Sequence, residues 1–403
     1  FLKDSAPLDT IRKIATGDEA AGAALAAGLD ELGLAGLHVP EAHGGLGLGL
    51  LDACLVQESL GYAIAPSRFL ATTVSAHAMR HAGEEFLSDI STGDIKMGLA
   101  LTELSSRRDG AGVTVAKDKL SGVSLLAVSA EGSTHLLAAD TNGALNLVET
   151  PSATPMQTID RTRIFSEVVF GGEMRAMSLK PDDEVLAAAR LLVAADTLGA
   201  AQAMLDKAVA YAAERQQFGR VIGSFQAVKH MCAEMAARLE PSRALIWHAA
   251  HALDTGEPEG LAMATLAKSH LAEAGTFIAR TSTEVHGGMG FTDLVGLHYW
   301  FKRIGVNRQL FGSPEACCRD DGFGIDLEVA VKVADRARLS EMLDAQRCRR
   351  MALHAADPGQ RGRVTIGNGD QRAVARDLFH QALDLARGRL VATRAGAPRG
   401  RPA

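Results

Sequence analysis

Apolar residues recur three and four positions apart along the first ninety residues, in the runs Leu8–Leu34, Leu50–Ile64 and Ser67–Ile90. This spacing places the apolar side chains on one face of an α-helix. The loop from Pro40 to Gly47 carries three glycines, but it lacks the Lys-Ser/Thr ending of a phosphate-binding loop, so we interpret it as a turn. The pattern predicts an N-terminal helical domain over residues 1–94.

From Ile95 to about Ala176 the apolar residues fall into short runs rich in β-branched side chains and separated by Gly, Asp and Asn. Runs of this kind, with a turn every eight to twelve residues, are typical of antiparallel strands. The predicted strands are Val113–Val115, Gly122–Ser129, Thr134–Ala138, Ala144–Val148 and Ile164–Phe170. We expect them to form a β domain over residues 95–180.

Helical periodicity returns after Pro181, where a proline and two acidic residues mark a helix start. Four long patterns follow: Glu184–Gln217, Gly223–Asp254, Glu259–Val285 and Phe291–Phe311. Pro241 removes a backbone donor and should kink the second helix. Short connections make neighbouring helices antiparallel, so we predict a four-helix bundle over residues 181–325. The fold class expected is mainly α with a β middle domain.

The remaining residues, 326–403, differ from the rest of the chain. Residues 347–403 hold 12 Arg and 4 Asp without any Lys or Glu, for a local net charge of +8. One short helical pattern, Arg372–Leu390, is too small for an independent core. We predict a loosely ordered Arg-rich extension, and a basic arm that docks an acidic partner remains an alternative.

Composition narrows the function classes. Lys and Arg number 42 against 48 Asp and Glu, which argues against nucleic-acid binding by the chain as a whole. The longest apolar stretch, Val185–Leu205, is interrupted by Arg190 and Asp196, so no membrane span is expected. Five irregularly spaced cysteines without a C-x-x-C pair indicate a reducing compartment, inert thiols and no metal site. The first residues show no secretory signal. We therefore expect a soluble, cytoplasmic protein.

Two motifs in the predicted bundle suggest ligand binding. The first runs Arg215-Gln216-Gln217-Phe218-Gly219, followed by Phe225-Gln226 at the next helix start. Arg pairs with a pyrophosphate in two-point geometry, and the free N–H groups of a first helical turn can bind an anion. Taken alone, this motif also fits an ordinary helix–loop–helix corner.

The second motif is Glu284-Val285-His286-Gly287-Gly288-Met289-Gly290-Phe291. Three glycines in four positions let a backbone pass close to a flat or charged group. A single His in such a place, here His286, is more typical of a structural hydrogen-bonding residue than of an acid–base group or a metal ligand.

Together, the two motifs and the order of domains resemble the acyl-CoA dehydrogenase family over roughly residues 5–316. The segment in which this family's chain leaves the β domain also has a counterpart here, in Asp160-Arg161-Thr162-Arg163 followed by Val168-Val169-Phe170. The resemblance implies an oxidoreductase acting on the CH–CH bond of an acyl-CoA thioester. In the family a Glu removes the α proton, FAD takes the β hydride, and an electron-transfer flavoprotein receives the electrons.

The family builds its FAD site across a subunit interface. By this resemblance Arg215, Phe218, Phe225 and Gln226 would contact the adenine–pyrophosphate half of an FAD held mainly by a neighbouring subunit. The segment Glu284, Val285, His286, Gly287 and Gly288 would line the same half.

Other parts of the family pattern are missing. The two positions where members carry the catalytic Glu are Phe311 and Ala189 here, and neither side chain accepts a proton. The nearest alternatives are Glu240 and Glu315, so the catalytic base stays unknown. On the flavin-ring side, Thr102–Asp109 lacks the usual glycines and Gly122–Leu126 lacks the usual Trp. In addition, Glu284 replaces the Gln that commonly opens the glycine motif, which places an acid toward a phosphate-bearing ligand.

The half of the site given to a neighbour is thus kept, whereas the half that would serve the chain's own flavin is lost. This asymmetry resembles the non-catalytic chain of heteromeric acyl-CoA dehydrogenases of the steroid side-chain type. The leading hypothesis is a subunit that completes the FAD site of a related partner chain. A self-sufficient homo-oligomeric dehydrogenase with a relocated base and a non-enzymatic acyl-CoA-binding or scaffold protein remain alternatives. The acyl or steroid substrate stays open.

Overall fold

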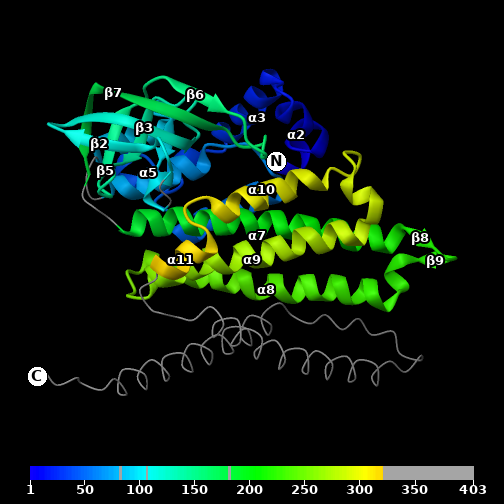
Figure 1. Ribbon diagram of the computed structural model, residues 1–403. Helices are drawn as coiled ribbons and strands as arrows, with labels where there is room; N and C mark the ends of the chain where they lie inside the picture. Colours follow the sequence, from blue (N-terminus) through cyan, green and yellow to red (C-terminus); the bar gives the residue numbers. More distant parts are fainter. Residues whose placement is uncertain (81–83, 106–107, 180–182, 321–403) are drawn as a thin grey trace, which may run out of the picture. The chain divides into compact units, whose positions relative to one another are not determined.

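The computed structural model of the chain describes residues 1–80, 84–105, 108–179 and 183–320. Within them the predicted order of helices, strands and helices is confirmed (Figure 1). The Arg-rich extension and its pattern at Arg372–Leu390 lie outside the described residues, so the loose order expected there stays a prediction, as do the domain boundaries.

The N-terminal region is helical as predicted, but two of its three helices are interrupted. Its α-helices are α1 (Leu2–Ser5), α2 (Leu8–Ala15), α3 (Glu19–Glu31), α4 (Leu50–Tyr62), α5 (Phe69–Met79) and α6 (Leu87–Thr92). The expected Leu8–Leu34 helix breaks at Gly17, which has a φ of +96°. Asp18 then caps α3 by accepting a hydrogen bond from the Ala21 N–H at 3.0 Å. A side-chain cap and a left-handed glycine therefore outweigh the apolar period across this break.

Seven strands form the middle domain: β1 (Met97–Ala100), β2 (Gly112–Ala116), β3 (Lys119–Val128), β4 (His135–Ala139), β5 (Leu145–Glu149), β6 (Ala153–Met156) and β7 (Phe165–Ser178). They follow the order β2-β3-β1-β4-β5-β7-β6, and a further pairing of β3 with β7 closes the middle of the sheet. The closed strands surround a core that includes Leu120, Leu136, Val148 and Phe170.

The sheet is not purely antiparallel, which corrects the sequence prediction. Strands β1 and β4 are parallel, with Leu99 opposite Leu137. The β2–β3 hairpin lies between them in the chain and lets β4 return beside β1 in the same direction. Sequence reasoning missed β1 because all four of its residues are buried, so it has no polar alternation to reveal a strand.

The C-terminal bundle consists of α7 (Asp183–Glu214), α8 (Gln226–Asp254), α9 (Gly260–His286) and α10 (Leu297–Gln309), followed by α11 (Pro314–Asp320). A small hairpin of β8 (Gln216–Gln217) and β9 (Arg220–Val221) joins α7 to α8. The fourth helix starts later than the predicted Phe291. Residues Gly287–Phe291 form a 3-10 turn, and Gly296, at a φ of +69°, directly precedes α10. Helix α8 continues through Pro241.

Helices α4 and α7 cross so closely that their backbones are in contact. This crossing joins the N-terminal region to the bundle. A Cβ added to Gly199 would lie 1.9 Å from the Glu58 carbonyl oxygen, and one added to Gly61 would lie 2.1 Å from the Asp196 carbonyl oxygen. No side chain fits at either position, so this close crossing requires glycine on both helices.

Candidate functional site

The two predicted cofactor motifs lie at the same end of the bundle. Helix α8 starts at the β8–β9 hairpin and runs back along the bundle, and α9 then returns toward the hairpin. The last turns of α7 and α9 therefore lie together at the end of the bundle that carries the hairpin (Figure 1). The Tyr211 ring of α7 stacks on the His286 ring of α9 with centroids 4.5 Å apart. We call residues 215–226 and 284–288 together the hairpin end.

Aromatic and cationic side chains project from the hairpin. Phe218 and Gly219 both have positive φ, at 53° and 75°, and the Phe218 side chain is 92% exposed. Its ring meets Phe225 edge-on at 6.1 Å, and the Arg220 guanidinium lies over Phe225 at 4.1 Å. An exposed ring on a strained backbone position contributes little to the fold of this chain itself, which favours a role at a ligand or partner.

The other predicted ligands from the first motif are also exposed. Both Arg215 and Gln226 lie at the surface. The Gln226 side-chain amide lies 3.0 Å from His230 Nε2, one helical turn further along α8. A cation, an amide and two aromatic rings therefore converge at this corner.

The second motif divides into exposed and buried members. Glu284, Gly287 and Gly288 are exposed, and a Cβ on either glycine would meet no atom within 4 Å. The Val285 and His286 side chains are buried. His286 Nδ1–H donates to the Ser282 carbonyl at 2.8 Å, and burial lowers the pKa of its imidazole. The His286 ring is therefore part of the helix packing, and the two glycines offer open backbone to a ligand.

Residue 311, one of the two positions where the resemblance predicts a catalytic Glu, lies in a buried turn. Phe311 is 1% exposed, has a φ of +59°, and accepts a hydrogen bond at its carbonyl from Arg190 Nε at 3.0 Å. Lys268 Nζ donates to the Gly312 carbonyl at 2.8 Å, and burial lowers the pKa of Lys268 to about 8. The alternative base position, Ala189, is fully buried in α7. Two cations thus hold the 311–312 turn.

The two nearest glutamates are poor candidates for a relocated base. The Glu315 side chain is 64% exposed and pairs with Arg308 at 3.2 Å. Hydrogen bonds from Ser313 and the Glu315 backbone, with Arg308 beside them, lower the pKa of Glu315 to about 2. A carboxylate this acidic removes a proton weakly at neutral pH. Glu240 lies exposed on α8.

On the predicted flavin-ring side, the chain satisfies its own polar groups. The Glu103 carboxylate accepts hydrogen bonds from the Leu125 N–H at 2.9 Å and from Ser124 Oγ at 2.8 Å. Thr102 Oγ1 donates to the Leu125 carbonyl at 2.7 Å. The Ser124 hydroxyl and both backbone groups of Leu125 are therefore bound by Thr102 and Glu103.

Ser105, which directly follows the Thr102–Leu104 turn, is a neighbour of Gly312. A Cβ added to Gly312 would lie 3.7 Å from Ser105 Cβ. It would also lie 3.3 Å from an Arg190 nitrogen, which is a tight approach. On this side Thr102 and Glu103 make their contacts within the chain, whereas Arg215, Phe218, Gly287 and Gly288 of the hairpin end are exposed.

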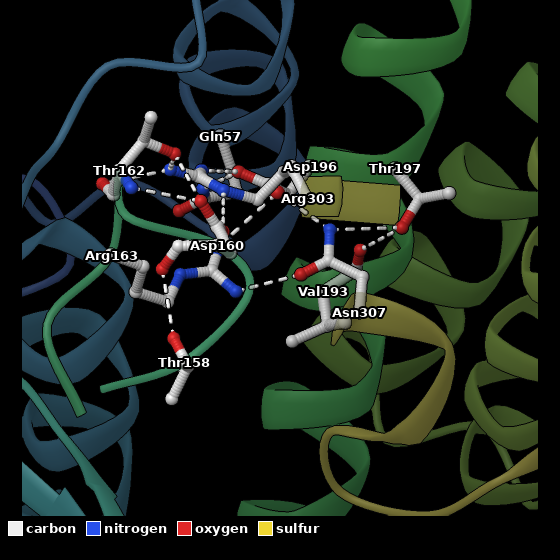
Figure 2. Close-up of polar contacts among 10 residues, drawn as sticks. All are labelled: Gln57, Thr158, Asp160, Thr162, Arg163, Val193, Asp196, Thr197, Arg303 and Asn307. Carbon is white, nitrogen blue, oxygen red and sulfur yellow. Dashed lines mark hydrogen bonds and ion pairs between the residues drawn. The ribbon is translucent and has the colours of Figure 1, made fainter. Parts of the chain in front are cut away.

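A buried charged network that the sequence analysis did not predict joins three regions (Figure 2). Asp196 of α7 accepts hydrogen bonds from Gln57 of α4 at 2.8 Å and from Asn307 of α10 at 2.6 Å. It also pairs with Arg163, which lies between β6 and β7, at 3.1 Å and with Arg303 of α10 at 3.3 Å. Asp196 is fully buried and bonded on every side, so it fixes the β domain against the helices.

Arg303 is the second centre of this network. Its Nε donates to Asp160 Oδ2 at 2.6 Å, and a terminal nitrogen donates to the Thr162 carbonyl at 2.9 Å (Figure 2). Burial by itself would raise the pKa of Asp196, but Arg163 and Arg303 hold it below its usual value. The signal available in the sequence was Arg190 and Asp196, two charges inside an apolar stretch. Both prove to be buried and to make specific contacts.

Comparisons with known proteins identify the family. A family model described as the acyl-CoA dehydrogenase C-terminal domain matches residues 182–320, and one described as the N-terminal domain matches residues 8–89. The chain is 32% identical to acyl-CoA dehydrogenase IpdE2 of Mycolicibacterium smegmatis over 71% of this chain and 82% of that protein.

The chain belongs to the acyl-CoA dehydrogenase family.

Solved acyl-CoA dehydrogenase structures share its fold. A single-residue variant of the Tcur3481-Tcur3483 steroid ACAD matches with a TM-score of 0.70 and 29% identity, over 80% of this chain and 93% of that chain. The ChsE4-ChsE5 complex from Mycobacterium tuberculosis matches with a TM-score of 0.71 and 22% identity, over 80% and 93%. Across the part of this dehydrogenase that the structure describes, every helix is too short or too polar to cross a membrane.

Proposed function

We propose that this acyl-CoA dehydrogenase chain is the non-catalytic subunit of a hetero-oligomer, in which it completes the FAD site of a related, catalytic chain. The observation that carries the proposal is the contrast between the two halves of the site. The hairpin end presents exposed side chains suited to a ligand, whereas the Glu103 carboxylate is bound to Ser124 and Leu125 and the Phe311 side chain is buried.

The hairpin end would hold the adenine–pyrophosphate half of the partner's FAD. Arg215 would pair with the pyrophosphate, because a guanidinium matches phosphate oxygens in two-point geometry. Phe218 and Phe225 would cover the adenine, and the Gly287-Gly288 backbone would approach the ligand without hindrance from a Cβ. Bound FAD supplies the hydride acceptor for α,β-dehydrogenation of the acyl-CoA, with an electron-transfer flavoprotein as the next acceptor.

The α-proton of the thioester would be removed by a carboxylate of the partner chain. This chain offers Phe311 and Ala189 at the two family positions, and its Glu315 is held ionised by hydrogen bonds and Arg308. The contribution of this chain to the reaction is therefore cofactor binding and assembly.

A steroid-derived acyl-CoA is the substrate class that we propose for the complex. The solved structure at 29% identity is named as a steroid acyl-CoA dehydrogenase and carries two protein names, which supports both the substrate and the two-chain assembly.

The test is co-expression with related acyl-CoA dehydrogenase chains from the same genome, followed by flavin quantification. We expect the chain alone to purify without stoichiometric flavin and a two-chain complex to purify yellow and active. If the chain alone binds one FAD per chain and dehydrogenates an acyl-CoA, it is a self-sufficient enzyme and the proposal fails. Thioester binding without flavin in any combination would instead indicate a scaffold protein.

Variants at the hairpin end sharpen the test. Arg215→Gln should lower the flavin content of the complex, because it removes the cation that would pair with the pyrophosphate. It should leave subunit association intact, because the Arg215 side chain is exposed and packs in no core. Arg280→Gln, an exposed cation on α9, is the matched control and should change neither. Glu284→Gln should strengthen flavin retention, because it removes a negative charge beside the phosphates.

A further inference from the structure

A second candidate site lies apart from both cofactor motifs. A pocket of about 460 Å³ opens between the end of α2, the segment 157–161 and the first turns of α10. Its volume is within the range of small-molecule sites, roughly 300–1,000 Å³. No residue of the hairpin end lines it, so the inference does not depend on the proposed function.

The charge of this pocket is positive. Arg161 and Lys302 line it, and within the described residues neither makes a hydrogen bond or an ion pair with another side chain. The carboxylate among the lining residues, Asp160, is 1% exposed and bonded to Arg303 at 2.6 Å and to the Thr162 N–H at 2.9 Å. Its charge is therefore neutralised inside the protein, and the two cations remain for an anionic ligand.

Two aromatic rings, an exposed apolar side chain and neutral acceptors also line the pocket. Tyr299 lies beside His298 with ring centroids 4.2 Å apart, and Ile159 is 62% exposed. The Thr16 and Thr158 hydroxyls donate to the Lys13 and Asp160 carbonyls, both at 2.9 Å. Their oxygens can therefore only accept from a ligand, which suits a molecule with N–H or O–H donors.

We propose that this pocket binds an adenine-type nucleotide. The phosphate would lie between Arg161 and Lys302, and the base would lie on Tyr299 and Ile159. Ribose hydroxyls or the adenine amino group would donate to the two threonines. The same chemistry occurs in a free nucleotide and in the nucleotide end of coenzyme A.

Isothermal titration calorimetry of the full chain with AMP, coenzyme A and inorganic phosphate tests the proposal. We expect saturable AMP binding that weakens about tenfold in Lys302→Gln and in Arg161→Gln, as the loss of one charge-assisted contact predicts. Tyr299→Phe should bind like the parent chain, and Tyr299→Ala should bind more weakly. Lys119→Gln on β3, an exposed cation far along the sequence, is the control. Thermal unfolding of each variant verifies that it is folded.

The three ligands separate the possible sources. Binding of AMP and coenzyme A with the same loss in both cation variants supports a site for the nucleotide end of coenzyme A, and binding of AMP alone supports a free nucleotide. The proposal is overturned if phosphate binds as tightly as AMP, if binding is the same in the variants, or if no nucleotide shows saturable binding at millimolar concentration.

Discussion

The Arg190 guanidinium donates a hydrogen bond to the backbone carbonyl of Phe311, with Nε and oxygen 3.0 Å apart inside the bundle. Phe311 stands at one of the two positions where the family resemblance predicts a catalytic Glu. In this chain the arginine binds the backbone of the turn, and Lys268 holds the next residue, Gly312, from the other side. Two buried cations thus hold the turn at Phe311 and Gly312.

Restoring the carboxylate alone should therefore not restore activity. We expect Phe311→Glu, expressed without a partner, to bind no stoichiometric flavin and to show no acyl-CoA dehydrogenation, because the Glu103 carboxylate still occupies the Ser124 hydroxyl and the Leu125 N–H. Flavin absorbance and a dye-reduction assay check this. A yellow, active variant would show that a single residue blocked the site.

The buried network should contribute strongly to stability. Arg303→Met leaves Asp160 and Asp196 buried without their shared cation, which we expect to lower the free energy of unfolding by about 3–5 kcal/mol. Arg280→Gln on α9 should stay within about 0.5 kcal/mol of the parent. Urea denaturation measures both, and a loss below about 1 kcal/mol for Arg303→Met would mean that the network is dispensable.

The same network predicts acid sensitivity. The pKa of Asp196 is lowered in the fold by Arg163 and Arg303, in spite of its burial. A carboxylate with a depressed native pKa stabilises the protein above its unfolded pKa of about 4, and this stability is lost as pH falls through the native value. Asp196→Asn should be less stable than the parent at pH 7 but should lose less on acidification.

Denaturant unfolding from pH 7 down to about pH 3 measures this difference. Asp30→Asn, an exposed residue on α3, is the control and should follow the parent at every pH. Parallel losses in the parent and Asp196→Asn would contradict the assignment of acid sensitivity to this carboxylate.

The helix crossing of α4 and α7 gives a prediction about packing. Gly199→Ala would bring a Cβ to 1.9 Å from the Glu58 carbonyl oxygen, so we expect a loss of about 3 kcal/mol or more, or failure to fold. Gly305→Ala in α10 has no atom within 4 Å of its new Cβ and should be neutral or stabilise by up to about 1 kcal/mol. Thermal unfolding of both variants decides the matter, and equal effects would show that the crossing can adjust.

Much of the fold could be read from the sequence, because it depends on short-range patterns. The period of Leu50–Ile64 gave α4 to within two residues, and the four bundle helices followed from periodicity and their connections. Errors arose where local chemistry was stronger than the period, as at Gly17 and Gly296, or where burial removed the alternation, as in β1. The parallel pairing of β1 with β4 joins segments almost forty residues apart, and no local pattern encodes it.

The sequence by itself determined the family, the order of helices and strands, and the absence of a glutamate at Phe311 and Ala189. Only the tertiary structure decided which residues contact Phe311, Asp160 and Leu125. Arg190 meets Phe311 across 121 residues, Arg303 meets Asp160 across 143, and Glu103 meets Leu125 across 22. A residue type can be read at its own position, but the partner of a buried charge is chosen by which helices and strands the fold brings together.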